Sequence, residues 1–326
     1  MFKIALLDDY QRVAMSSAPW AGLPAQCQVE AFHDFLGEED ALAKRLADFD
    51  CVMALRERTL FPRSLLERLP KLKFLPTAGM RNAAIDMEAA TELGILVCGT
   101  AGISESTAEL TWGLILSVLR HIPQEHQLTM QGQWQHTLGV GLKGKTLGLL
   151  GLGKIGGMVA AVGKAFGMNL IAWSQNLTDE RAAECGAKRV DKDTLCREAD
   201  VLTIHTVLSD RTRGLLAARE LGLMKPTAVL VNSSRGPIVN EQALAAALRN
   251  KVIAGAGLDV YGQEPLPKEN HFTSLDNVVL TPHLGYVTQE VYQLFYGVTC
   301  ENIKNYLAGN YERALNPEVL DKLRPR

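Results

Sequence analysis

A glycine-rich turn near the middle of the chain constrains its fold more than any other feature. Residues 146–174 read TLGLLGLGKIGGMVAAVGKAFGMNLIAWS, in which a short apolar run leads into the turn GLGKIG at 151–156, then into a helical pattern and a second apolar run. In this order of strand, turn, helix and strand, the GxGxxG pattern predicts dinucleotide binding. Gly151 allows the tight turn, Gly153 lets the backbone approach a pyrophosphate, and Gly156 lets helix and strand pack closely. The alternative is a glycine-rich turn of an ordinary βαβ unit, and the well-placed strand and helix favour the dinucleotide.

Length, charge and cysteine usage narrow the class of protein. The chain has 326 residues, of which 47% are apolar, and a formal net charge of −2. This length suggests two domains, and the weak charge gives no basic field to attract nucleic acid or anionic lipid. No apolar run approaches the ~18 residues of a membrane span, and the N-terminal MFKIALLDDY reads as a strand rather than a signal peptide. The six cysteines have no CxxC pair or metal-ligand spacing. We therefore expect reduced thiols in a cytoplasmic protein without a metal, rather than disulfides or zinc.

Strand-like and helical patterns alternate in the N-terminal third. Strands are predicted at 3–7, 28–32, 51–55, 74–77 and 95–98, and helices at 38–49, 62–69 and 85–93. Repeated βα alternation predicts a parallel, doubly wound sheet of the flavodoxin-like kind. A long amphipathic stretch, 104–121, follows, with Ser104 as a candidate cap. Only the polar segment 123–143 comes after it, so we interpret this helix as a bridge between domains.

The central part of the chain alternates again. Strands are predicted at 146–150, 169–173, 201–205, 228–232, 253–258 and 277–280, enough for a complete Rossmann dinucleotide-binding domain. A final helix at 288–307 has no strand partners nearby, and we expect it to return to the N-terminal domain. The fold predicted is α/β, with two doubly wound parallel-sheet domains and a cleft between them. The substrate domain is discontinuous, 1–100 and 287–326, and the dinucleotide-binding domain is 101–286.

Three polar clusters follow predicted strands of the central domain, where open α/β sheets bind ligands. They are NSSRG at 232–236, GLDV at 257–260 followed by EPLP, and TPH ending at His283. An arginine such as Arg235 can hold a carboxylate with two charge-assisted hydrogen bonds. His283 can supply a proton, and a carboxylate such as Glu264 favours its charged form. Singly, each could be a surface residue or a turn cap; together, and after a nucleotide fold, they predict ketone–alcohol redox chemistry.

The chain resembles the D-isomer-specific 2-hydroxyacid dehydrogenase family nearly from end to end. The resemblance begins with Arg56-Glu57-Arg58-Thr59, which matches an R-x-x-T motif after a strand, and with Ala78-Gly79-Met80 at the glycine loop. STAEL at 106–110 resembles the opening of the interdomain helix, and GLGKIG, NSSRG, GLDV, EPLP and TPH follow in the family's order. The resemblance implies an NAD(P)-dependent enzyme that interconverts small 2-keto acids and D-2-hydroxy acids. It also implies a homodimer joined through the nucleotide domain and the interdomain helix.

The family's residue roles carry over onto matching positions. By resemblance, Arg235 binds and polarises the keto acid, and His283 is the general acid in reduction and the general base in oxidation. Glu264 pairs with His283, and Asp259 lies near the nicotinamide carboxamide. The predicted substrate-binding residues are Arg56, Ala78, Gly79, Met80 and Arg235. The predicted cofactor-binding residues are Thr107, Gly151, Gly153, Lys154, Ile155, Gly156, Ser174, Gln175, Asn176, His205, Thr206, Ser234, Asp259 and His283.

The sequence departs from the dinucleotide fingerprint at Ser174. An Asp or Glu is expected about 20 residues after the glycine turn, to bind the ribose hydroxyls of NAD, but here the second strand ends in Ser174-Gln175-Asn176. Without a carboxylate nothing repels a 2′-phosphate, and Arg181 is the nearest cation. We therefore favour NADP(H) over NAD(H).

Two further departures concern the substrate loops. The glycine loop continues RNAAID at 81–86, where many relatives have Asn nearly adjacent to Asp. After TPH the chain reads Leu284-Gly285-Tyr286, where relatives often have a second glycine. Tyr286 either contacts substrate or packs against the returning helix.

Two other functions use the same scaffold. Formate-type oxidation replaces the carboxylate partner of the histidine with an amide, so Glu264 argues against it. A dinucleotide-sensing binding protein with secondary redox activity can retain the same motifs, and it is the alternative to the enzyme.

Overall fold

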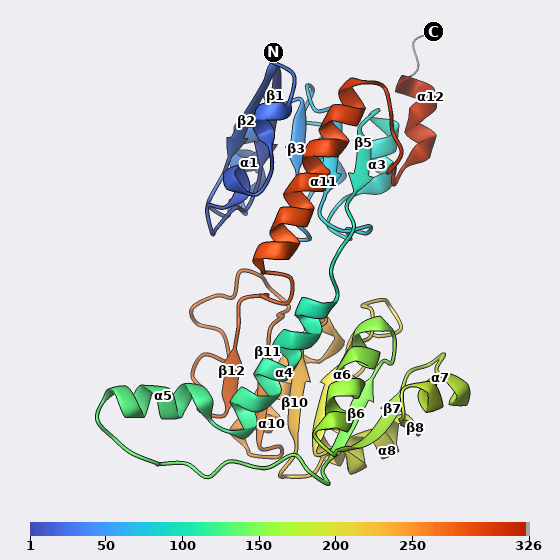
Figure 1. The fold of residues 1–326 in the computed structure, drawn as a ribbon. Coiled ribbons are helices and arrows are strands. Elements are labelled where there is room, and N and C mark those ends of the chain that lie inside the picture. Colours follow the sequence, from blue (N-terminus) through green and yellow to red (C-terminus); the bar gives the residue numbers. More distant parts are fainter. Residues whose placement is uncertain (324–326) are drawn as a thin grey trace. The chain divides into compact units, whose positions relative to one another are not determined.

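The computed structural model describes residues 1–323. It divides into two compact units, each with its own sheet (Figure 1). Unit 1 consists of Met1–Ile103 together with the chain from Thr288 onward, and unit 2 is Ser104–Val287. The breaks lie at 103/104 and 287/288, compared with the 100/101 and 286/287 expected from the sequence.

Unit 1 is built on a five-stranded parallel sheet of order β2-β1-β3-β4-β5. Its strands are β1 (Phe2–Leu6), β2 (Cys27–Ala31), β3 (Cys51–Met53), β4 (Phe74–Thr77) and β5 (Leu96–Gly99), and its helices are α1 (Glu39–Leu46), α2 (Arg63–Leu66), α3 (Met87–Glu92), α11 (Gln289–Leu307) and α12 (Leu320–Leu323). Helices α1, α2 and α3 share one apolar core with the sheet. Helix α11 returns to this sheet, as expected, and its Tyr306 stacks on Phe74 of β4 at 4.6 Å between ring centroids.

Unit 2 is built on a seven-stranded parallel sheet of order β12-β11-β10-β9-β6-β7-β8. Its strands are β6 (Thr146–Leu150), β7 (Asn169–Trp173), β8 (Lys188–Arg189), β9 (Val201–Ile204), β10 (Val229–Asn232), β11 (Gly255–Leu258) and β12 (Val278–Leu280). Its helices are α4 (Glu105–Leu119), α5 (Ile122–Met130), α6 (Lys154–Ala165), α7 (Asp179–Glu184), α8 (Lys192–Glu198), α9 (Ala218–Leu223) and α10 (Glu241–Arg249). Short 3-10 turns complete both units, at Ala14–Ser16, Trp20–Gly22, Gly236–Ile238 and Pro317–Val319.

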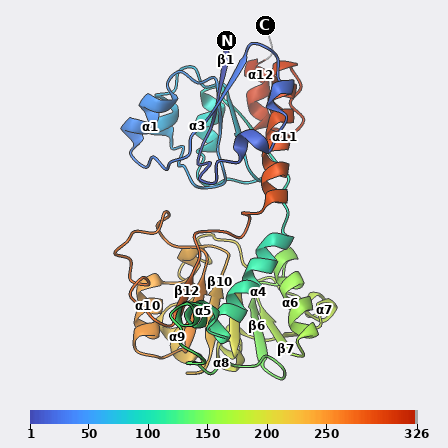
Figure 2. The ribbon, with the colours of Figure 1, turned by 60° about the vertical axis from the view of Figure 1, so that its left-hand side comes forward.

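Two apolar cores sandwich the unit 2 sheet, and helices lie on both of its faces (Figure 2). Helices α4 and α6 cover one face, where Trp112 and Val159 are buried. Helices α8, α9 and α10 cover the other face, where Leu195 and Leu244 are buried. Strands covered on both faces are apolar along their whole length, which is why the sequence predicted them as continuous runs. No helix within residues 1–323 is long and apolar enough to cross a bilayer.

Three details differ from the sequence-based expectation. The sheet has a seventh strand, β8, whose two residues are exposed and show no apolar pattern. A separate helix, α5, runs into the polar segment 123–143, for which no helix was predicted, and none of its residues is buried. Ser104 precedes α4, but its side chain makes no capping hydrogen bond, because its backbone is already helical, with φ −90° and ψ −18°.

Candidate active site

The predicted motifs of unit 2 lie at one edge of its sheet. The sheet is parallel, so the carboxyl ends of β6, β9, β10, β11 and β12 share that edge. The glycine turn follows β6, the NSSRG segment follows β10, Asp259 follows β11 and His283 follows β12. Ligands bind at this edge in open α/β sheets, so the fold brings the predicted chemistry to the expected place.

The glycine turn leaves the N-terminus of α6 open. Gly151 has φ +99°, and a Cβ there would lie 2.8 Å from the Thr206 backbone nitrogen, so only glycine fits. A side chain at Gly156 would collide with the Gly151 carbonyl oxygen, which brings the helix close to the turn. At Gly153 a Cβ would meet nothing within 4 Å. The first N–H groups of α6 are therefore accessible to an anionic group, as a pyrophosphate requires.

A cavity of about 300 Å³ adjoins this turn. It is lined by Gly151, Leu152, Gly153, Ser174, Asn176, Leu177, Thr178, Arg181, His205, Thr206 and Val207. Arg181 lies beside the turn, because its Nε donates to the Leu152 carbonyl at 3.2 Å and its Nη2 to that of Gly153 at 3.5 Å. Among the lining residues there is no carboxylate. A dinucleotide fits this set: an open helix N-terminus, neutral polar groups at the end of β7 and one cation.

Within the predicted cofactor set, Lys154, Ile155 and Gln175 do not line this cavity, whereas His205 does. Gln175 is exposed and does not line the cavity. Lys154 and Ile155 form the first turn of α6, and the Lys154 ammonium lies 3.9 Å from Glu105. The His205 Nε2 lies 3.0 Å from the Thr203 hydroxyl, and burial lowers the pKa of His205 from 6.5 to about 3. His205 is therefore a neutral side chain at neutral pH.

Arg235 lies on a loop that its neighbours fix. The Asn232 side chain donates to the Arg235 carbonyl at 3.0 Å and accepts from the Ser234 N–H at 3.0 Å. The Ser234 hydroxyl donates to the Thr206 carbonyl at 2.6 Å, which joins this loop to the end of β9. The Arg235 guanidinium donates to the Ser234 carbonyl at 2.7 Å. The loop backbone is thus constrained before any ligand binds.

His283 and Glu264 form a close hydrogen-bonded pair. The His283 Nδ1 lies 2.6 Å from Glu264 Oε2, and Glu264 Oε1 accepts the Tyr261 backbone N–H at 2.9 Å. His283 has a left-handed backbone with φ +55°, which is uncommon for a residue other than glycine. The Tyr286 ring meets the imidazole edge-on at 5.4 Å. Because Nδ1 is bound to the carboxylate, Nε2 is the atom left for a substrate.

Asp259 holds the loop that carries His283. Its carboxylate has no exposed surface, and its Oδ1 accepts from the Thr281 hydroxyl at 2.6 Å and the Leu284 N–H at 2.7 Å. Its Oδ2 accepts from the Gly285 N–H at 2.9 Å. Burial raises the pKa of Asp259, opposed by these hydrogen bonds. Both oxygens of the Asp259 carboxylate are thus engaged by the loop that carries His283.

Thr107 and two unpredicted residues support the same loops. Thr107, on α4, donates its hydroxyl to the Gly285 carbonyl at 2.9 Å. The Thr111 and Ser233 hydroxyls lie 2.6 Å apart and join α4 to the Arg235 loop. Only the position of Thr111 one helical turn after Thr107 hints at its role in the sequence.

In unit 1, Arg56 lies against the glycine loop. Its Nη1 donates to the Ala78 carbonyl at 3.1 Å, and a side chain at Gly79 would collide with this guanidinium. The N–H groups of Ala78 and Gly79 already donate, to the Ala54 carbonyl at 3.0 Å and the Thr100 hydroxyl at 2.8 Å. Within residues 1–323 the Met80 N–H has no hydrogen-bond acceptor. Of the three loop N–H groups, that of Met80 is therefore the one not engaged within the described part of the chain.

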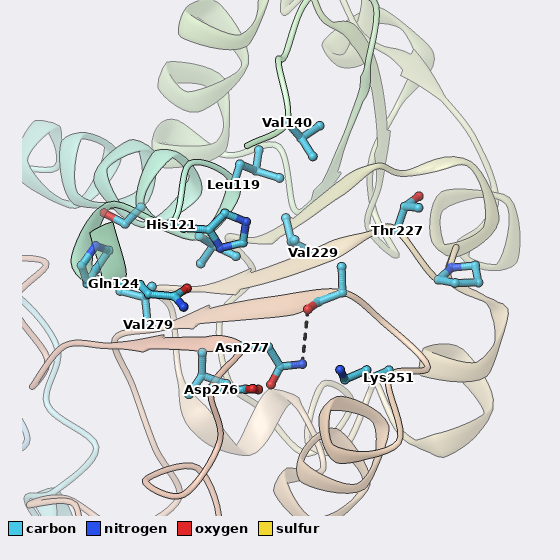
Figure 3. Close-up of a pocket in the computed structure, with 16 residues that line it drawn as sticks. Leu119, His121, Gln124, Val140, Thr227, Val229, Lys251, Asp276, Asn277 and Val279 are labelled. Atoms are coloured by element: carbon cyan, nitrogen blue, oxygen red, sulfur yellow. Dashed lines mark hydrogen bonds between the residues drawn. The ribbon is translucent and has the colours of Figure 1, made fainter. Parts of the chain in front are cut away.

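A larger cavity of about 430 Å³ lies at the amino ends of β10, β11 and β12 (Figure 3). The end of α4, the start of α5 and Val140 line it together with Thr227, Lys251 and Asn277. No residue predicted to bind cofactor or substrate lines it. Nor does the described part of the chain bring together three His, Cys, Asp or Glu side chains that could hold a metal.

The fold and site define a dinucleotide-binding α/β protein with an arginine loop and a histidine–carboxylate pair at one sheet edge. Residues 112–285 match the family model of the D-isomer specific 2-hydroxyacid dehydrogenase NAD-binding domain. A glyoxylate reductase of Aeropyrum pernix is 40% identical over 88% of this chain and 86% of its own length. A D-3-phosphoglycerate dehydrogenase of Methanocaldococcus jannaschii is 39% identical over 100% of this chain, which spans 62% of that relative's length.

Comparison with solved structures leads to the same class of enzyme as comparison with the sequence relatives. The phosphoglycerate oxidoreductase of Vibrio cholerae has a TM-score of 0.90 and 36% identity, covering 94% of this chain and 99% of its own. The chain belongs to the D-isomer-specific 2-hydroxyacid dehydrogenase family, as its motifs implied.

Proposed function

We propose that the protein is an NAD(P)-dependent oxidoreductase that interconverts small 2-keto acids and D-2-hydroxy acids. The observation that carries this proposal is the 2.6 Å pair of His283 and Glu264, which shares a sheet edge with the glycine turn and the Arg235 loop. A dinucleotide-sensing binding role is not favoured, because the relatives reported above are named dehydrogenases and reductases.

The proposed mechanism assigns one task to each side chain. A nicotinamide dinucleotide held at the glycine turn would supply the hydride in reduction and accept it in oxidation. In reduction, His283 donates a proton from Nε2 to the carbonyl oxygen, and in oxidation Nε2 removes it from the hydroxyl. Glu264 orients the imidazole through its contact with Nδ1. Arg235 binds the substrate carboxylate with two parallel hydrogen bonds and polarises the keto group.

We further propose that unit 1 contributes to substrate binding through Arg56 and the Met80 N–H. Ala78 and Gly79 shape this loop, since their own N–H groups are already bonded. Unit 1 is then the substrate domain and unit 2 the dinucleotide-binding domain.

The activity is tested with a panel of 2-keto acids. Glyoxylate, hydroxypyruvate, pyruvate and the 2-keto acid of 3-phosphoglycerate are assayed with NADPH and with NADH. We expect turnover of at least one of them, and a fall in kcat of about a hundred- to ten-thousandfold in His283→Asn. Cofactor affinity should fall far less than kcat, because the substitution removes the group that transfers the proton.

The matched control is His271→Asn, which removes an exposed histidine of the same unit and should leave kcat unchanged. An absence of turnover with every keto acid and both cofactors, while the dinucleotide still binds, would contradict the proposed activity. Equal losses of kcat in the two variants would remove His283 from the mechanism.

We propose that NADP(H) is the preferred cofactor. The residue at the end of β7 is Ser174, which lacks the negative charge that would repel a 2′-phosphate. Asn176, Thr178 and Arg181 line the same cavity, so the phosphate would find polar donors and one cation there. The ratio of kcat/KM for NADPH and NADH tests this, and a strong preference for NADH would refute it.

We propose that the protein is a homodimer formed through unit 2. The last residue of α5 and the segment after it expose large apolar side chains, with Met130 and Trp134 each 76% exposed and Leu138 93% exposed. Val140, which follows these residues in the chain, lines the 430 Å³ cavity of Figure 3. A second copy related by a twofold axis can cover these side chains, since in such an interface each subunit offers the same surface.

We also propose a cytoplasmic location. The six cysteines are free, which supports a reducing compartment.

A further inference from the structure

Tyr261 is a buried residue that contacts all three loops of the proposed active site. It lies three residues after β11, and only 5% of its surface is exposed. Neither the polar clusters nor the glycine fingerprint marks it, because an aromatic residue after a buried strand usually belongs to the core. Its contacts are nevertheless polar and specific.

The first two contacts of Tyr261 are with the two halves of the acid–base pair. Its backbone N–H donates to Glu264 Oε1 at 2.9 Å. Its hydroxyl lies 2.9 Å from the Thr281 carbonyl oxygen and 3.0 Å from that of Leu258. Thr281 accepts the His283 N–H through the same carbonyl oxygen, at 3.1 Å. One residue therefore holds Glu264 directly and His283 through the turn that precedes it.

The third contact is with the arginine loop. A side chain at Gly236 would collide with the Tyr261 carbonyl group, so the two backbones lie directly against one another. Gly236 is adjacent to Arg235, the proposed carboxylate clamp. Burial raises the pKa of the Tyr261 phenol, which keeps its hydroxyl a donor throughout the neutral range.

We propose that Tyr261 is a positioning residue that sets the distance between Glu264 and His283 and braces the loop of Arg235. This inference rests on the proposed function. Without the hydroxyl, Glu264 keeps its bond from the Tyr261 N–H, and the turn at Thr281 keeps its N–H bond to the Leu258 carbonyl and its hydroxyl bond to Asp259. The Thr281 carbonyl oxygen, which also accepts the His283 N–H, loses its Tyr261 donor. The His283 imidazole then samples a wider range of orientations, and fewer of them direct Nε2 at a substrate. Proton transfer suffers, whereas substrate and dinucleotide contacts stay in place.

The test is Tyr261→Phe, which removes only the hydroxyl. We expect kcat to fall about five- to tenfold, as the loss of one hydrogen bond predicts, with KM for the keto acid and Kd for the dinucleotide within about twofold. The matched control is Tyr296→Phe, because this buried tyrosine of unit 1 has a hydroxyl with no hydrogen-bond partner among the described residues. It should leave kcat unchanged. Wild-type kcat in Tyr261→Phe would overturn the proposal.

A double-mutant cycle separates positioning from general damage. In a Glu264→Gln background, the pair that Tyr261 positions is already impaired, so adding Tyr261→Phe should lower kcat by less than about twofold. Fully additive losses would show that Tyr261 acts independently of the pair and would overturn the proposal. The failure of the proposed function looks different, because the wild-type protein itself would then reduce no keto acid.

A second variant provides an independent test. Gly236→Ala pushes the Tyr261 backbone away from the Arg235 loop, so we expect KM for the keto acid to rise severalfold together with a fall in kcat. Wild-type values of both constants in this variant would overturn the bracing of Arg235. The melting temperature of each variant, measured with and without dinucleotide, shows whether it is folded.

Discussion

The backbone of His283 illustrates how single residues prepare this site. A left-handed conformation costs a residue other than glycine about 1–2 kcal/mol, and such conformations persist only where the surroundings impose them. Asp259 imposes this one, because its buried carboxylate accepts hydrogen bonds from the Thr281 hydroxyl and from the N–H groups of Leu284 and Gly285. Arg56, with φ +58°, has the same conformation in unit 1. Both residues belong to the proposed substrate site.

His205 gives a prediction for stability against pH. Its pKa is 6.5 in an unfolded chain and about 3 in the folded protein, because burial disfavours the charged form. The unfolded chain thus binds the proton more readily. The corresponding stability is fully present above pH 6.5 and is lost as the pH falls from there toward 3. Lowering the pH from 7.5 to 5 should reduce the free energy of unfolding by about 1–2 kcal/mol through this residue alone.

Urea unfolding of unit 2 at the two pH values measures this effect in the wild-type protein, in His205→Gln and in His126→Gln. The loss of unfolding free energy between pH 7.5 and pH 5 should be smaller by about 1–2 kcal/mol in His205→Gln. It should remain in His126→Gln, because that histidine is exposed. Identical losses in all three proteins would show that His205 does not titrate abnormally.

At the scale of elements, β7 and α7 together form the proposed phosphate site. Arg181 is seven residues after Ser174, yet α7 returns it to the glycine turn, where it donates to the carbonyls of Leu152 and Gly153. The capping bond from the Arg181 N–H to the Thr178 hydroxyl, at 3.2 Å, fixes where this helix begins. The Arg181 guanidinium therefore lies at the cavity, although Arg181 is far from the glycine turn in the sequence.

Cofactor preference should respond to both residues. Ser174→Asp places a carboxylate where the 2′-phosphate is expected, and we expect kcat/KM for NADPH to fall about tenfold or more relative to NADH. Arg181→Met should lower kcat/KM for NADPH about tenfold while NADH changes little, since only NADPH carries the phosphate. The control is Arg189→Met, which lies on the neighbouring β8 outside the cavity. Equal effects on both cofactors would argue against a phosphate site here.

The strands were more predictable than the connections between them. Strands β9, β10 and β11 are buried along their whole length, and β6 and β7 along most of theirs, so apolar runs predicted them. Strand β8 is exposed and too short to form a pattern. Local motifs likewise identified Glu264 and His283, which the structure brings to 2.6 Å. The ties made by Asp259 and Tyr261 join residues that are about 20 positions apart. Such contacts depend on how strand ends meet in the sheet, which no local pattern encodes.

At the scale of the whole molecule, the exposed segment after α5 predicts association. We expect light scattering to give a dimer for the wild-type protein. Trp134→Glu places a charge in the proposed interface and should raise the dimer dissociation constant about a hundredfold or more. Trp134 is 76% exposed in the single chain, so the fold of the monomer should survive. The control is Gln133→Glu, which adds the same charge next to it. A wild-type monomer at micromolar concentration would contradict the proposed dimer.

The insertion of unit 2 between the two parts of unit 1 has a consequence for biosynthesis. The sheet of unit 1 is covered on one side by α11, which the ribosome makes only after residues 104–287. At ordinary elongation rates that interval lasts roughly 10–40 s. During it, Phe74 and its neighbours lack the Tyr306 ring that later stacks on them. Unit 2 has all of its own sequence by then and can fold first. The nascent N-terminal strands are thus the part of this chain that a chaperone would need to shield.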